Sequence, residues 1–380
     1  MPDAVAPPPL HPRFPLMDGM RAIAVLAVVA VHVTVFADPP AGLRYLIHLN
    51  IGVTIFFLIS GFLLYRPFIA HRTGGPAAPG IGKYAKRRLL RILPAYWLVL
   101  AVLAIVPGLT ATAGESTVAH VILLQTLLPI GSESSCVTAL LDCGLAQTWS
   151  LVAEVTFYAL LPLYVLLAGR LAVGRTPRQW VPLELALLAL LAVASVALRF
   201  TVMDTTALFT GSVAGYVLWF ALGMALAVLS VGGLEAGGAV RSATERLGRH
   251  PTVAWAAAVV AYFFLARALP PTPFVLATGE QLLAHVGFGV IAALLMLPAV
   301  FDDRAGGLPR RLLGLRPVAW LGLISYGIFL WHYVFTVELG SPGEGLGWLP
   351  LLAVTLGGTI PIAAASYYAV ERPILKLKYR

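Results

Sequence analysis

One apolar stretch near the start of the chain contains three ionisable residues. Residues 17–36 read MDGMRAIAVLAVVAVHVTVF and hold Asp18, Arg21 and His32. An ionisable group inside a bilayer costs about 2–3 kcal/mol or more, so such a group is a candidate functional residue. In a helix, Arg21 and His32 would share one face, about 16 Å apart along the axis. The spacing predicts a cation near one membrane surface and a general base, His32, deeper in.

A second apolar stretch, AQTWSLVAEVTFYALLP, contains Glu154. Residues recur there at three- and four-residue spacings, which places them on one side of a helix: Trp149, Ser150, Glu154, Phe157 and Tyr158. We expect Glu154 to orient His32 and to hold its ring in one tautomer. The alternative is a structural carboxylate that pairs with an arginine.

A dense group of basic residues lies in the segment KYAKRRLLRILPAYW. Arg87, Arg88 and Arg91 stand at i, i+1 and i+4, so two guanidinium groups share a helix face, and their fork geometry suits phosphate. Tyr96 could supply a stacking face for a base. These four residues and Arg21 are the candidate binding residues for an anionic cofactor. The alternative is that the basic residues only anchor the chain at the inner membrane surface.

Several polar residues inside apolar stretches are candidates for substrate binding. Ser60 lies in FFLISGFLLYRP beside Gly61, a residue typical of close helix packing. His332, in ISYGIFLWHYVF, is expected near the outer end of its span, within reach of solvent, and is a weaker candidate than His32. The candidate substrate-binding residues are Asp18, Ser60, Trp149, Ser150, Tyr158, Ser325 and His332.

Composition sets the class of protein that must position these residues. Of 380 residues, 59% are hydrophobic and 11% are charged, and apolar runs of about 20 residues recur, as in transmembrane helices. We predict an all-α polytopic membrane protein with about ten transmembrane helices. The predicted spans are 17–37, 50–69, 92–108, 146–168, 180–199, 213–231, 251–269, 281–300, 317–337 and 348–370.

The basic residues indicate how these spans are oriented. With the N-terminus inside, 22 of the 26 lysines and arginines fall in cytoplasmic segments. We therefore expect both termini in the cytoplasm, an irregular segment over 1–16, one membrane domain over 17–372 and a basic tail over 373–380. Residues 118–130 are too short to span and are expected to form a re-entrant or interfacial helix on the outer side.

Two cysteines, Cys136 and Cys143, share one predicted outer loop. In an oxidising compartment we expect them to form a disulfide, with two free thiols as the alternative. A metal site is not expected, because no second pair of Cys or His ligands lies beside them. We also expect no appended soluble domain, and the net charge of +9 is better explained by membrane orientation than by nucleic-acid binding.

Six segments, in order along the chain, resemble the acyltransferase 3 family of bacterial integral-membrane acyltransferases. In the first, Arg21 and His32 match an arginine and a histidine separated by ten residues. The others are IGVTIFFLISGFLLYRP, KRRLLRILPAYW, TWSLVAEVTFY, LGLISYGIFLWH and SYYAVERPILKLK. Asn50, Ile51 and Thr54 depart from the aspartate common in the second motif, and Ala153 departs before Glu154. These departures bear on the identity of the acceptor more than on the reaction.

The resemblance implies transfer of an acyl group, often acetyl, from cytoplasmic acyl-CoA to a hydroxyl of a glycan, lipid or small molecule. It places the protein in the inner membrane, with His32 and Glu154 as catalytic residues and without a metal. Many members carry an additional hydrolase-like domain, and without one we expect the membrane domain itself to receive the acceptor. The main alternative function is a transporter or flippase of a lipid-linked or anionic substrate. No inverted repeat or unwound pair of half-helices is evident to favour it, and a non-catalytic scaffold would not explain a buried His32.

Overall fold

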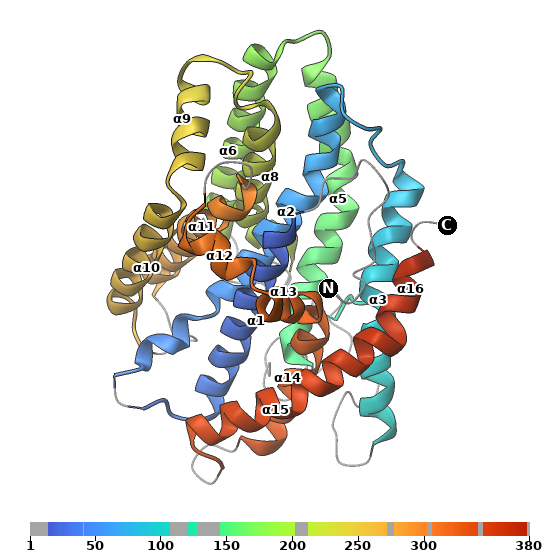
Figure 1. Ribbon diagram of the computed structural model, residues 1–380, viewed down its shortest axis with the longest axis vertical. Coiled ribbons are helices and arrows are strands. Elements are labelled where there is room, and N and C mark those ends of the chain that lie inside the picture. Colours follow the sequence, from blue (N-terminus) through green and yellow to red (C-terminus); the bar gives the residue numbers. More distant parts are fainter. Residues whose placement is uncertain are drawn as a thin grey trace.

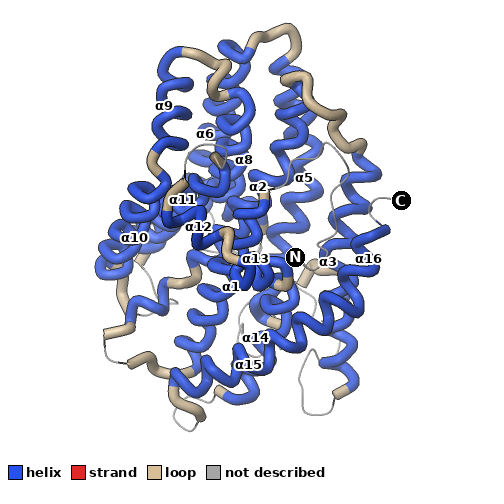
Figure 2. Tube along the Cα trace, in the orientation of Figure 1, coloured by secondary structure: helices blue, strands red, loops and turns tan. Residues whose placement is uncertain are grey.

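The computed structural model describes residues 14–40, 42–106, 120–125, 127, 145–201, 212–271, 277–301, 306–340 and 345–377. Within these ranges the chain is helical and contains no strand (Figures 1 and 2). The long helices are α1 (Pro15–Phe36), α2 (Ile51–Arg72), α3 (Ile81–Ile105), α5 (Trp149–Ala172), α6 (Pro177–Thr201), α8 (Val217–Gly232), α10 (Pro251–Ala268), α11 (Thr278–Val300) and α15 (Trp348–Ser366). The shorter elements are η1 (Arg44–His48), η2 (Ala146–Thr148), η4 (Val213–Tyr216), α9 (Gly238–Arg249), α12 (Leu308–Leu313), α13 (Arg316–Leu323), α14 (Ser325–Leu339), the π-helical turn η5 (Tyr367–Glu371) and α16 (Arg372–Lys376).

The predicted all-α membrane fold is confirmed in the described ranges. Nine helices there are long and apolar enough to cross a membrane, and α13 with α14 would form a tenth span. The chain is therefore a multi-pass membrane protein. The ninth predicted span is not one straight helix, however, because α13 and α14 meet at an angle of 72° on either side of Ile324. The pattern of apolar residues alone did not reveal this break between two shorter helices.

Helix α1 lies in the middle of the bundle, and α13 packs closely against it (Figure 1). A Cβ atom on Gly322 would overlap the backbone carbonyl of Asp18, and one on Gly19 would overlap the carbonyl of Leu313. Small residues let helix backbones approach in this way. Helix α14 also contacts α1, so the chain stays against α1 on both sides of the break at Ile324.

Helices α2 and α8 form the most extensive helix pair of the described fold. A Cβ atom on Gly61 would overlap the carbonyl of Phe220, and one on Gly223 would overlap the carbonyl of Leu58. Gly61 therefore does serve the close packing predicted for it. The resulting rigid pair holds one wall of the site described below.

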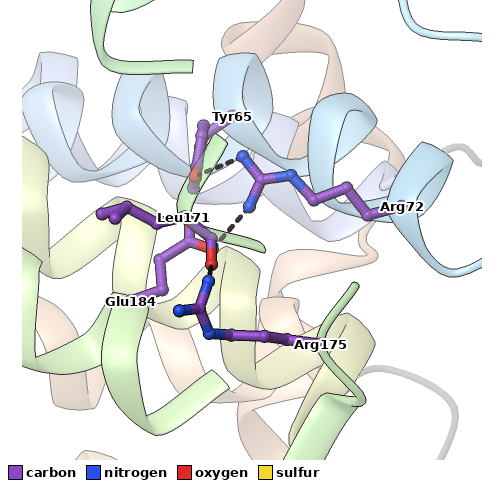
Figure 3. A network of polar contacts seen from close by, with 5 residues as sticks. All are labelled: Tyr65, Arg72, Leu171, Arg175 and Glu184. Atoms are coloured by element: carbon purple, nitrogen blue, oxygen red, sulfur yellow. Dashed lines mark hydrogen bonds and ion pairs between the residues drawn. The ribbon is translucent and has the colours of Figure 1, made fainter. Parts of the chain in front are cut away.

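A buried ion pair joins α2 to α6 (Figure 3). Arg72 Nη1 lies 2.5 Å from Glu184 Oε2, and Arg72 Nη2 donates to the Tyr65 hydroxyl at 3.4 Å. Next to this pair, Arg175 donates to the carbonyl of Leu171 and so caps the end of α5. Removing either partner of such a pair strongly destabilises the fold, because the other charge would remain buried without compensation.

Three further regions refine the sequence-based expectations. Helix α3 begins at Ile81, before the predicted span over 92–108, so the basic segment near residue 87 belongs to the same helix as that span. The predicted interfacial helix over 118–130 lies partly outside the described residues. Within it, residues 120–125 and 127 are described and form a short turn. Cys136 and Cys143 also lie outside the described residues, so their disulfide stays a prediction.

Candidate functional site

A pocket opens between α1, α2, α3, α5 and α14, with a volume of about 110 Å³. Its walls are mostly apolar, and its polar groups come from all five of these helices. The polar lining residues are Arg21, Ser60, Arg88, Arg91, Ser150, Glu154, Tyr158, Ser325 and Tyr326. Mostly apolar walls with a few converging polar groups are typical of a small-molecule binding site.

Glu154 is the centre of the pocket's hydrogen bonds. Its Oε1 accepts from the Tyr158 hydroxyl at 2.6 Å, and it also accepts from the hydroxyl of Ser60 on α2. Tyr158 follows Glu154 by one helical turn, which brings the two side chains together. The Arg88 guanidinium lies over the Tyr158 ring at 5.8 Å. A carboxylate, two hydroxyls and a cation therefore form one connected group.

Three arginines give the pocket its positive character. Arg21 comes from α1, and Arg88 and Arg91 come from one face of α3. Arg21 is paired with Asp18 at 2.6 Å, one turn earlier in α1, so Asp18 orients Arg21 and is not itself among the lining residues. Arg87 is absent from the lining as well. Of the three arginines at the start of α3, Arg88 and Arg91 therefore line the pocket.

His32 and His332 form a hydrogen-bonded pair between α1 and α14. His32 Nδ1 lies 3.0 Å from His332 Nε2, and His332 Nδ1 lies 3.0 Å from the carbonyl of Ile328. His332 is fully buried, so the expectation that solvent reaches it is wrong. The edge of the Tyr333 ring packs against His32, with ring centroids 5.2 Å apart.

This arrangement corrects the expected partner of His32. Glu154 was expected to orient it, but the hydrogen bonds of Glu154 go to Ser60 and Tyr158, and the partner of His32 is His332. The reason lies in the fold, because Glu154 on α5 faces α2 and α3, whereas α14 brings His332 against α1.

The contacts of the pair fix its tautomers when both rings are neutral. A carbonyl oxygen only accepts, so His332 Nδ1 must carry the proton that it donates to Ile328. His332 Nε2 then has a lone pair and accepts from His32 Nδ1–H. His32 Nε2 is left unprotonated. A ring held in this tautomer can take a proton at Nε2, as a general base must.

The pocket and the histidine pair adjoin each other through one side chain. Phe329 lines the pocket, and its ring centroid lies 6.2 Å from that of His332, one turn further along α14. His32 and His332 are not themselves lining residues. The arginines and the histidines thus belong to two neighbouring parts of one site.

Two candidate residues lie away from the pocket. Tyr96 is fully buried, and its hydroxyl donates to the carbonyl of His120 at 2.8 Å, so it offers no stacking face there. Trp149 packs against Phe57 and Tyr216 in an aromatic cluster behind the wall. Ser60, Ser150, Tyr158 and Ser325 do lie together, as lining residues.

Sequence reasoning missed two kinds of contribution to the site. Tyr326 and Phe329 complete the lining from α14, and the available signal was their position one and four residues after Ser325. No period in the sequence could pair His32 with a residue 300 positions away. Among the described residues, no group of three or more His, Cys, Asp and Glu side chains could hold a metal ion.

Comparison with known proteins places the chain in a family. The family model of acyltransferase 3, an acyltransferase domain, matches residues 14–369. YrhL of Bacillus subtilis is 26% identical over 400 residues, and the peptidoglycan O-acetyltransferase OatA of Listeria monocytogenes is 25% identical over 374 residues. These matches cover 97% and 95% of this chain.

The relatives differ in how much of their own length is matched. The chain spans 56% of the length of both YrhL and OatA. It is also 28% identical over 348 residues to the exopolysaccharide production protein ExoZ of Rhizobium meliloti, covering 86% of this chain and 89% of ExoZ. No solved structure matches the chain. The family model covers all of the residues that line the pocket or form the histidine pair, and the chain belongs to the acyltransferase 3 family.

Proposed function

We propose that the chain is a membrane O-acyltransferase that moves an acyl group, acetyl in the simplest case, from acyl-CoA to a hydroxyl of a glycan acceptor. Family membership and the names of its relatives, a peptidoglycan O-acetyltransferase and an exopolysaccharide production protein, support the class of reaction and acceptor. The observation that carries the proposal is the His32–His332 pair beside an arginine-lined pocket.

The pocket suits the anionic part of the donor. Arg21, Arg88 and Arg91 offer three guanidinium groups, whose planar forks match phosphate oxygens. Their charge exceeds that of the one carboxylate in the lining, Glu154. The phosphates of CoA bind here in this proposal, and the thin pantetheine arm extends past Phe329 towards the histidines.

His32 acts as the general base. The acceptor hydroxyl gives its proton to His32 Nε2 as its oxygen attacks the thioester carbonyl. The C–S bond then breaks, the ester bond remains, and the CoA thiolate takes a proton from His32 and leaves. His332 keeps His32 in the reactive tautomer by accepting from Nδ1–H. General-base catalysis of this kind contributes roughly 10²- to 10⁴-fold.

Glu154 has a role in the donor half of the site. It holds the hydroxyls of Ser60 and Tyr158, and Tyr158 in turn lies under Arg88. Glu154 therefore positions the polar wall against which the donor lies. In this proposal the donor enters the site from the cytoplasmic surface of the membrane, where the charge pattern predicts most of the basic residues to lie.

Release of free thiol from acetyl-CoA by the purified protein in lipid nanodiscs tests the proposal. His32→Ala should keep acetyl-CoA binding and lose transfer, whereas His71→Ala, at the exposed end of α2, should behave as wild type. Arg88→Ala and Arg91→Ala should raise the KM for acetyl-CoA, and Arg241→Ala on α9 should not. Full activity of His32→Ala would refute the base assignment. A transporter would release no thiol at all.

A further inference from the structure

Two buried glutamine side chains, Gln125 and Gln147, each have one polar atom without a partner. Gln125 is 7% exposed and Gln147 is 3% exposed, and the Oε1 atom of each makes no hydrogen bond. Nearly all buried polar atoms in proteins are hydrogen-bonded, so such atoms need an explanation. Both residues lie outside the pocket lining and have no part in the reaction proposed above.

The neighbours of Gln147 determine which end of its amide is free. Its Nε2 approaches the carbonyl oxygens of Phe329 and Leu330 at 3.5 and 3.2 Å. Carbonyl oxygens accept only, so the amide nitrogen must face them and the amide oxygen must point elsewhere. Rotating the amide by 180° would set oxygen against oxygen.

The neighbours of Gln125 determine its orientation too. Its Nε2 lies 3.0 Å from the Thr148 hydroxyl, and that hydroxyl donates its one proton to the carbonyl of Leu145 at 2.7 Å. The Thr148 oxygen can then only accept, so Gln125 must present its nitrogen. Its oxygen is left over, as in Gln147.

Hydrogen bonds connect the two glutamines to both halves of the site. Thr148, the partner of Gln125, is adjacent to Gln147 in η2, and the Ser150 hydroxyl, which lines the pocket, donates to the backbone carbonyl of Gln147 at 3.1 Å. On the other side, Gln147 bonds to the turn of α14 that carries His332. Trp331, on that turn, is 7% exposed and has an indole N–H without a partner.

The chemistry of these atoms indicates what they bind. Two amide oxygens accept hydrogen bonds, and the partners of both amides are neutral hydroxyl and carbonyl groups. A hydroxyl satisfies a free acceptor, whereas an anion offers no donor and is placed better among the arginines. Sites that hydrogen-bond a substrate hydroxyl discriminate strongly against analogues that lack it, because their polar groups would then stay unpaired.

We propose that Gln125 and Gln147 form an acceptor subsite for the hydroxyl groups of an uncharged sugar, separate from the donor pocket and next to the His32–His332 pair. The proposal rests on the acyl transfer to a hydroxyl proposed above. Through it the protein holds vicinal hydroxyls of the sugar while His32 deprotonates the one that reacts.

Sugar binding in the absence of any acyl donor tests the subsite. Wild-type protein in nanodiscs is titrated with N,N′-diacetylchitobiose, maltose and cellobiose, and binding is followed by tryptophan fluorescence and calorimetry. We expect saturable binding of at least one sugar. Gln125→Met should weaken it roughly 2- to 13-fold, the loss of one net hydrogen bond. Gln147→Met should weaken it as well, and Gln179→Met, at the exposed start of α6, should not.

The variants are chosen so that a folding defect is visible. Gln125→Met leaves the Thr148–Leu145 hydrogen bond intact, so the helices and the acetyl-CoA KM should not change. With the best-binding sugar as acceptor, its KM should rise in Gln125→Met while the acetyl-CoA KM stays constant. No binding of any of the three sugars, or equal binding by wild type and Gln125→Met, would overturn the subsite. Sugar binding without thiol release would instead overturn the proposed function and leave the subsite standing.

Discussion

Replacing His332 by alanine removes the group that accepts the His32 Nδ1–H hydrogen bond. His32 Nδ1 lies 3.0 Å from His332 Nε2, and His332 is fully buried. Leaving a buried donor unsatisfied costs about 1–3 kcal/mol. If this cost is felt in the transition state, kcat should fall roughly 5- to 150-fold, because about 1.4 kcal/mol is a factor of ten.

Steady-state kinetics of thiol release measures this effect. The loss should be in kcat, with the KM for acetyl-CoA unchanged, since His332 is not a lining residue of the arginine pocket. His332→Gln should recover part of the activity, because its amide oxygen can accept from His32 Nδ1–H in place of His332 Nε2. In the His32→Ala background, His332→Ala should have little further effect, since residues that act as a unit are not additive. Wild-type kcat in His332→Ala, or fully additive losses in the double variant, would refute the pairing.

Two predictions concern the packing of the bundle. Glu184→Ala leaves the Arg72 charge without its partner and should cost about 3–5 kcal/mol of stability. The measurement is the midpoint of thermal unfolding in detergent, which should fall. If a second change, Arg72→Met, restores the midpoint, the unpaired charge is the cause. Gly223→Ala forces a Cβ atom into the Leu58 carbonyl and should lower the free energy of unfolding by about 1–3 kcal/mol. The control is Gly357→Ala on α15, which has open space around it and should be neutral. Equal midpoints of unfolding for these two variants would contradict the close α2–α8 contact.

The membrane fold could be predicted from the sequence because each span carries its own signal. An apolar run such as residues 15–36 is long enough to cross a bilayer, whatever its neighbours are. The break at Ile324 was not predictable in this way. Gly322, just before the break, packs against the Asp18 backbone, and hydropathy along α13 and α14 says nothing about a partner on α1.

The site could be predicted in its residue types but not in its pairings. Arg21, His32 and Glu154 are ionisable groups in apolar helices, which made them candidates without any structure. Which of them meet depends on how the helices pack. Glu154 contacts Ser60 on α2, and His32 contacts His332 on α14, and neither spacing along one helix nor burial reveals such a contact.

The pairing of His32 with His332 also sets an order of events during synthesis. The two residues are 300 positions apart, and α1 is made and inserted long before α14 exists. Until then His32 has no acceptor from the distant helix, Gly19 has no α12 to pack against, and Asp18 has no α13. The reactive pair therefore forms only when most of the chain is in the bilayer. An incompletely inserted chain can carry Arg21, Arg88 and Arg91 and still lack the His32–His332 pair.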